Sequence, residues 1–171
     1  MKKYLTVILL LFFVFMTYNY LTYPNFEEIK KNLKKDYKDY SKGEDIDKLT
    51  YIDDVFFEER TNFKFPQEKV SSAKIYGNSF FFSKNLNKNE IEFLLKKFND
   101  SSSFRWGEIG TFINYKTIIF YNDYNKIIGI TEVDEDYGQT YSVPMTKKMK
   151  WGFLKFKDEK ELSFFKEIVD Y

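Results

Sequence analysis

Two similar tripeptides contain the clearest candidate binding residues of this chain. Arg105-Trp106-Gly107 and Lys150-Trp151-Gly152 hold the only two tryptophans in the sequence. A tryptophan beside a basic residue can stack on a sugar, a base or a cation, and glycine lets a ligand approach the backbone. The structural alternative is that each indole caps an open end of a sheet while each glycine occupies a turn with positive φ. The candidate ligand or partner surface consists of Arg105, Trp106, Lys150 and Trp151.

Four carboxylates form a second candidate site: Glu108, Glu132, Asp134 and Asp136. Two of them could act as the acid and base of a glycoside hydrolase, which needs two carboxylates at a set separation. The last three alternate and could also hold Ca²⁺, but the EF-hand pattern fails because its sixth residue is not glycine and its twelfth is Val143. Nothing in the spacing requires catalysis. We therefore expect a solvated acidic turn, with no metal site and no catalytic residue.

The composition removes several kinds of chemistry. The chain of 171 residues contains no cysteine and no histidine. Disulfides, thiolate ligands, Cys nucleophiles, His-based acid–base catalysis and His metal ligation are therefore excluded. The net charge is +1, whereas a nucleic-acid-binding domain usually has a basic face. An enzyme is the less favoured interpretation, and we expect no cofactor and no nucleic-acid partner.

The first 23 residues predict a signal anchor. Lys2 and Lys3 precede a uniformly apolar run over residues 7–16. From Tyr4 to Leu21 a helix would be about 27 Å long, close to the ~30 Å hydrocarbon thickness of a bilayer. A signal peptide needs small residues at its cleavage site, and residues 1–40 contain no Ala, Gly or Ser. An uncleaved anchor is thus favoured over a cleaved signal peptide, and over a buried core helix.

The flanking charges bear on membrane orientation. Lys2 and Lys3 favour a cytoplasmic N-terminus by the positive-inside rule. The lysines between residues 30 and 38 favour the opposite orientation, but they lie farther from the apolar run and are interspersed with acidic residues. We therefore expect a single-pass protein whose single domain, residues 24–171, lies outside the cytoplasm.

A central β-hairpin organises the expected domain. Two runs of β-branched and aromatic residues flank the turn-forming Asn122-Asp-Tyr-Asn125 between residues 110 and 133. A further strand is expected over residues 139–143, before Pro144. Since Ile119 and Ile127 are also apolar, both faces of the hairpin can be covered. Period-two alternation predicts that one face buries four residues together: Ile118, Phe120, Ile128 and Ile130.

Three amphipathic segments predict helices. Asn25 with Glu28, and Asn87 with Glu90, form capping boxes before apolar residues at helical spacing. The first helix should run to about residue 40, and it could instead lie on the membrane as a basic helix. A third helix is expected over residues 158–169. Residues 44–67 predict irregular structure with short strands, and residues 74–82 predict a hairpin around Gly77-Asn78.

These elements together predict an α+β fold. An antiparallel β-meander should pack with two or three helices, behind one N-terminal membrane-directing helix. The favoured function is a membrane-anchored extracytoplasmic binding or interaction module, such as an accessory or protective protein, with a protein or glycan as its partner. The alternative is a carboxylate-dependent hydrolase that acts on a glycan-like polymer. We also expect the rings of Trp106 and Trp151 to lie near each other.

Overall fold

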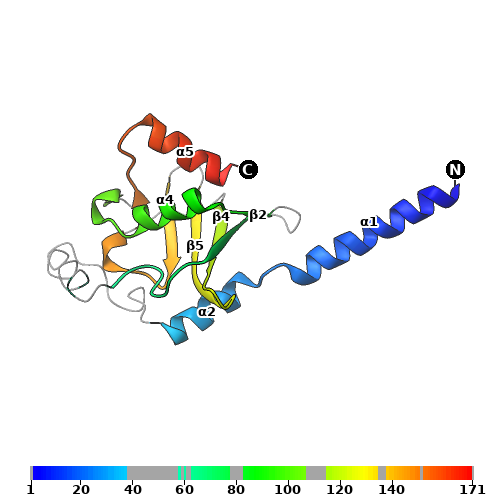
Figure 1. Ribbon diagram of the computed structural model, residues 1–171, viewed down its shortest axis with the longest axis horizontal. Helices are drawn as coiled ribbons and strands as arrows, with labels where there is room; N and C mark the ends of the chain where they lie inside the picture. The colour runs from blue at the N-terminus through cyan, green and yellow to red at the C-terminus, as the bar shows by residue number, and fades with distance from the viewer. Residues whose placement is uncertain are drawn as a thin grey trace.

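In the computed structural model, a long helix, α1 (Lys2–Thr22), projects from a layered α+β domain (Figure 1). The structure describes residues 2–37, 58, 60, 63–77, 83–106, 115–134, 138–150 and 152–170. The apolar stretch of α1 is exposed throughout, and none of it is buried against the domain. Within the described ranges, α1 is the helix that is long and apolar enough to cross a membrane. The predicted N-terminal apolar helix is therefore present.

The domain is built on a five-stranded antiparallel sheet with the order β2-β1-β4-β5-β6. The long central strands β4 and β5 form the predicted hairpin, and β6 continues the meander. A second, two-stranded sheet pairs β3 with β7. The strands are β1 (Ser72–Tyr76), β2 (Ser83–Asn85), β3 (Phe104–Arg105), β4 (Tyr115–Tyr121), β5 (Ile127–Asp134), β6 (Thr140–Val143) and β7 (Phe153–Leu154).

Helices cover both faces of the five-stranded sheet. Helix α2 (Phe26–Asp36) contributes Leu33 to a cluster with Ile119 and Ile130 on one face. On the other face, α4 (Lys88–Phe98) and α5 (Glu159–Val169) pack against a larger core (Figure 1). Two short 3₁₀ helices complete the described elements: η1 (Ser101–Ser103) and η2 (Lys147–Met149). The α+β prediction is confirmed.

The predicted helix starts are confirmed at the level of single hydrogen bonds. Asn25 Oδ1 accepts from the backbone N–H of Glu28 at 3.2 Å, and Asn87 with Glu90 forms a complete capping box. These side chains satisfy N–H groups that the first turn of a helix leaves unpaired. Helix α2 ends at Asp36, earlier than predicted, because Tyr37 adopts an extended conformation.

The core arrangement corrects one prediction about the hairpin. Ile118, Phe120 and Ile128 lie in the core beneath α4 and α5, but Ile130 lies on the opposite face beneath α2. The cause is a β-bulge, since Phe120 pairs with Gly129 whereas Tyr121 pairs with Ile127. A bulge inserts one extra residue and reverses the alternation beyond it. The expectation that both faces are covered is confirmed.

Some predictions concern segments that the structure describes only in part. Tyr76 of β1 pairs with Ser83 of β2, but the predicted turn at Asn78 and the strand over residues 80–82 lie outside the described residues. Most of residues 44–62 also lies outside them. Phe65 is described and fully buried, with its ring 5.4 Å from that of Phe120. Its ring lies against Gly129, where an added Cβ would approach it to 3.0 Å.

Candidate functional site

The small β3–β7 sheet brings the flanks of the two Trp-Gly tripeptides together. Arg105 is paired with Phe153, and Phe104 with Leu154. Arg105 is exposed and Trp106 is half-buried, so both retain accessible surface. Trp151 lies outside the described residues, and the expected closeness of the two indole rings stays a prediction. The described part of the candidate surface is thus Arg105 and Trp106 on β3 and its end, beside the half-buried Phe153.

Lys150 has a different role from Arg105. Its ammonium donates to the carbonyl oxygen of Phe104 at 2.7 Å and to that of Ser101 at 3.2 Å. Burial, together with the nearby charge of Lys155, lowers the pKa of Lys150. These bonds tie the end of η2 to η1 and β3. Lys150 therefore helps to build the surface, whereas Arg105 is the cation that the surface exposes.

Gly152 is required by a close approach between two strands. Its φ is +79°, and a Cβ at this position would lie 2.0 Å from the carbonyl oxygen of Thr140. Thr140 also donates from its backbone N–H to the Gly152 carbonyl oxygen at 2.6 Å. Glycine is the residue that tolerates both conditions. At the second tripeptide, then, the glycine matches the structural alternative of a turn with positive φ.

Two of the four candidate carboxylates lie on a strand and not in the acidic turn that the sequence predicts. Glu132 and Asp134 are not in a solvated turn, because both belong to β5 and are largely buried. Glu132 is paired with Lys30 of α2, with 2.9 Å between Oε1 and Nζ. Glu108 and Asp136 lie outside the described residues. In the described parts of the chain, no group of three Asp or Glu residues could hold a metal ion.

Lys30 of α2 links this helix to the face of the sheet that it covers. It bonds to Glu27 on its own helix as well as to Glu132. Burial alone would lower the pKa of Lys30, but the hydrogen bonds that its ammonium donates to both carboxylates outweigh burial and raise the pKa. The ammonium is therefore held in its charged form. Glu132 is the partner of a cation that joins α2 to β5, which is a structural role.

A shallow hollow of about 310 Å³ lies beside this ion pair. Lys34 donates to the Tyr141 hydroxyl at 2.8 Å and lies over the Tyr141 ring. Sequence reasoning missed this group, because Lys34 and Tyr141 are 107 positions apart. The available signal was the spacing of Lys30 and Lys34, which places both on one face of a helix. The hollow is lined by Glu27, Lys30, Lys31, Lys34 and Tyr141.

A second polar cluster ties the end of α2 to the turn of the central hairpin. The Tyr37 hydroxyl donates to Glu68, and the Asn122 side chain donates to the other carboxylate oxygen at 2.7 Å. These two hydrogen bonds lower the pKa of Glu68, and the nearby Lys126 adds to the effect. Tyr37 and Asn122 are thus both bonded to Glu68, and the cluster joins the end of α2 to the hairpin turn.

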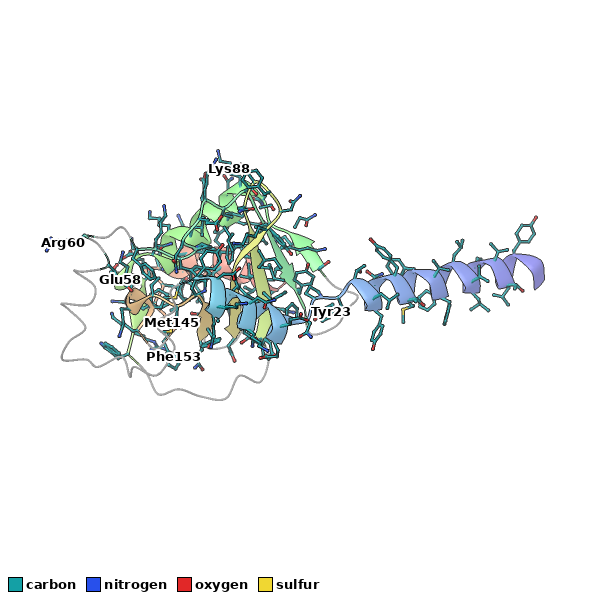
Figure 2. The ribbon with its side chains drawn as sticks, turned by 90° about the horizontal axis from the view of Figure 1, so that it is seen from below. Tyr23, Glu58, Arg60, Lys88, Met145 and Phe153 are labelled. Atoms are coloured by element: carbon teal, nitrogen blue, oxygen red, sulfur yellow. The ribbon has the colours of Figure 1, made fainter. Side chains whose placement is uncertain are left out.

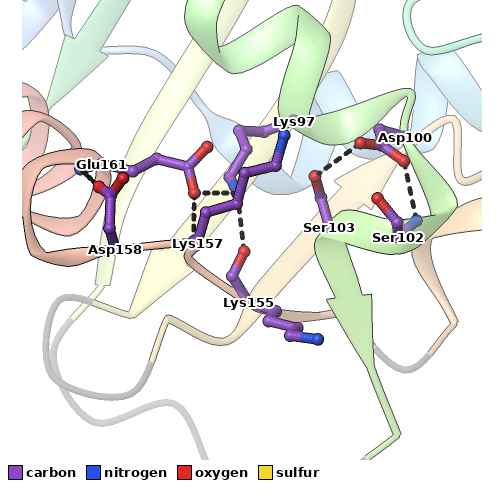
Figure 3. A network of polar contacts seen from close by, with 8 residues as sticks. All are labelled: Lys97, Asp100, Ser102, Ser103, Lys155, Lys157, Asp158 and Glu161. Carbon is purple, nitrogen blue, oxygen red and sulfur yellow. Dashed lines mark hydrogen bonds and ion pairs between the residues drawn. The ribbon is translucent and has the colours of Figure 1, made fainter.

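The most deeply buried cation with a described ion pair is Lys97 of α4 (Figure 3). Its ammonium donates to the carbonyl oxygen of Lys155 at 2.7 Å and to Glu161 Oε2 at 2.9 Å. It also lies 5.0 Å from the centre of the Phe156 ring. Buried lysines can serve as nucleophiles when their charge is disfavoured. Here the ammonium is bonded to two oxygens and lies over a ring, so Lys97 fixes α5 to α4.

No protein-family model, curated protein or solved structure matches the chain. Among the described groups, the charged and polar clusters hold elements of the fold together. Arg105 and Trp106 differ from them in keeping accessible surface on a small sheet.

Proposed function

We propose that this chain is a single-pass membrane protein whose domain, residues 24–171, is a binding module outside the cytoplasm. The observation that carries the proposal is an apolar helix, with no buried residue in its apolar stretch, that leads directly into a domain with a separate core. A helix with such a surface is stable in hydrocarbon and unfavourable in water. An accessory or protective protein that meets its partner at the cell surface fits this organisation.

The binding surface in this proposal is centred on Arg105 and Trp106. Tryptophan and arginine are the residue types most enriched where binding energy concentrates, and both stack on sugar rings and aromatic groups. In Figure 2, Phe153, the strand partner of Arg105, is on the side of the domain away from Tyr23 and α1. A soluble protein or a glycan would have access to a surface in that position.

The absence of cysteine allows a direct test of topology. Ser102 is exposed, so a Ser102→Cys variant of the full chain carries the single thiol of the protein. A membrane-impermeant maleimide added to intact cells should label it. Labelling that requires permeabilised cells would overturn the extracytoplasmic orientation. Intact mass of the membrane-bound protein tests the anchor, because loss of about twenty N-terminal residues would show cleavage at a signal-peptide site.

A second experiment tests the binding surface itself. The full chain in detergent is applied to a printed panel of neutral and acidic glycans, and is cross-linked in its native membrane to identify protein partners. Trp106→Ala should weaken the binding found by about tenfold or more, equivalent to ~1.4 kcal/mol, with little change in Tm. Tyr124→Ala is the matched control, since this tyrosine is 90% exposed in a separate turn. Equal binding by wild type and Trp106→Ala would refute the surface.

A further inference from the structure

The connection between α1 and the domain is tied to the sheet. Helix α1 ends at Thr22, and α2 begins at Phe26 after the Asn25 cap. In the short link, the Tyr23 hydroxyl donates to the carbonyl oxygen of Gly77 at 2.9 Å. Gly77 directly follows β1, so the last turn of α1 is connected to a strand of the domain. A flexible tether would make no such bond.

Three aromatic rings strengthen this connection. The rings of Tyr23 and Phe26 are 5.3 Å apart, those of Tyr23 and Tyr76 are 6.0 Å apart, and those of Phe26 and Tyr76 are 5.7 Å apart. All three pairs meet edge to face, which is a favourable geometry for aromatic side chains. Tyr76 belongs to β1, whereas Tyr23 and Phe26 flank the link. The aromatic joint, Tyr23, Phe26 and Tyr76, thus sets the direction of α1 relative to the sheet.

The joint determines which side of the domain is nearest to the membrane. Tyr76 pairs with Ser83 of the edge strand β2, so β2 lies beside the joint. Figure 1 shows β2 on the side of the domain from which α1 projects, and Figure 2 shows Tyr23 at the same junction. Phe153 of β7 is at the opposite side in Figure 2. The β2 edge therefore faces the bilayer that α1 would cross.

The residues on this side suit a lipid headgroup layer. Tyrosine is favoured at membrane interfaces because its ring is apolar and its hydroxyl is polar. Tyr115, at the start of β4, is 38% exposed and lies near enough to Tyr23 for an electrostatic interaction. Ser83 on the edge strand is exposed and polar. Headgroups in contact with the edge would also cover the outer backbone groups of β2, which is an edge strand in the described part of the sheet. Such edges otherwise invite pairing with another chain.

We propose that the domain is seated on the membrane, with Tyr23 and Tyr115 at the level of the lipid headgroups and the β2 edge facing them. This inference rests on the proposed anchor, and it adds a fixed orientation to it. The aromatic joint holds the domain in place, so that Arg105 and Trp106 are presented away from the lipid. The partner of the β2 edge is the headgroup layer itself.

Two single-cysteine variants of the full chain test this orientation. Ser83→Cys is beside the joint, and Ser102→Cys is in η1, next to the β3–β7 sheet; both serines are exposed. Each thiol is labelled with NBD and the protein is reconstituted into phosphatidylcholine–phosphatidylglycerol vesicles that contain a headgroup spin-labelled lipid. Quenching of NBD should be at least about twofold stronger at position 83 than at position 102. The spin label lies in the headgroup layer, which extends only roughly 5–8 Å beyond the hydrocarbon, so it reaches a probe beside the bilayer and not one on the far side of the domain.

A linker insertion tests the role of the joint without disturbing the domain. A flexible Gly-Ser insert of about ten residues between Thr22 and Tyr23 keeps every contact of Tyr23 but frees α1. Quenching at Ser83 should then fall towards that at Ser102. Equal quenching at the two positions before insertion would overturn the seated orientation, and a difference that survives insertion would overturn the role of the joint. Failure of the protein to float with vesicles would instead overturn the anchor.

Discussion

Replacing Lys97 with methionine tests the interior of the domain most directly. The change keeps the length of the side chain and removes the ammonium, which is bonded to Glu161 and to the Lys155 carbonyl oxygen. Removing one partner of a buried ion pair costs about 3–5 kcal/mol. The side chain of Glu161 is 18% exposed and keeps a hydrogen bond from the Lys157 backbone N–H at 2.6 Å, so part of its charge stays solvated. We therefore expect a loss of about 2–4 kcal/mol in the free energy of unfolding.

The assay is thermal unfolding of the full chain in detergent, followed by near-UV circular dichroism. For a chain of this size the expected loss corresponds to a drop in Tm of roughly 5–15 °C. Lys88→Met is the matched control, because Lys88 is on the same helix and pairs with Glu92 at 3.7 Å, but the two side chains are 88% and 64% exposed. An exposed pair of this kind contributes about 0–1 kcal/mol. A Lys97→Met loss as small as that of Lys88→Met would refute the buried arrangement.

The pH dependence of the same variant provides an independent check. Burial alone would raise the pKa of Glu161, but hydrogen bonds from the Lys157 backbone and from Lys97 outweigh it and lower the pKa. A carboxyl with a lowered pKa in the folded state stabilises above its unfolded pKa of 4.5, and this stabilisation is lost as the pH falls through the folded pKa. The stability difference between wild type and Lys97→Met should therefore narrow below pH 4.5. A difference that is constant from pH 7 to pH 3 would contradict the pairing.

Three further changes test separate parts of the fold by chemical or thermal unfolding. Phe120→Ala should cost about 3–5 kcal/mol because this ring is fully buried, and a loss below ~0.5 kcal/mol would show that the core is elsewhere. Gly152→Ala should lower the free energy of unfolding by at least about 1–3 kcal/mol, since the added Cβ would meet the Thr140 carbonyl oxygen at 2.0 Å. An unchanged Tm would refute this contact. Lys30→Met should destabilise the domain at pH 7 by leaving Glu132 unpaired. Because the pKa of Lys30 is raised above its unfolded value of 10.5, its contribution is fully present below pH 10.5 and is lost as the pH rises through the higher folded pKa, so the effect should shrink in strongly alkaline buffer.

Local signals in the sequence predicted the starts of helices and the central hairpin. Asn25 and Asn87 cap helices because their side chains reach N–H groups only three residues ahead. The turn from Asn122 to Asn125 is likewise closed locally, with the Asn122 side chain accepting two backbone N–H groups. Such interactions depend on residues that are adjacent in the chain, so the residue types alone indicate them.

Contacts between distant residues could not be predicted in this way. The β-bulge that moves Ile130 to the other face depends on strand register, which residue types on one strand do not specify. The ammonium of Lys150 binds the Phe104 carbonyl oxygen, a backbone atom that no side-chain pattern indicates. Tyr23 and Gly77 are 54 positions apart, and Lys30 and Glu132 are 102 apart. The sequence identified Arg105 and Trp106 as candidate binding residues. It did not indicate that Lys150, the basic neighbour of the second tryptophan, holds parts of the fold together.

The covering of both sheet faces limits where this domain can bind a partner. Central residues such as Ile118 and Ile119 point to opposite faces and are both fully buried, so both faces of β4 are covered at its centre. The proposed binding surface is accordingly sought at an edge of the sheet or on elements outside it. The β2 edge is on the side of α1 (Figure 1), whereas β6 is continued by the bridge between Gln139 and Phe153 into the β3–β7 sheet. Arg105 lies on that small sheet and is exposed, so its charge is accessible on the side of the domain away from α1.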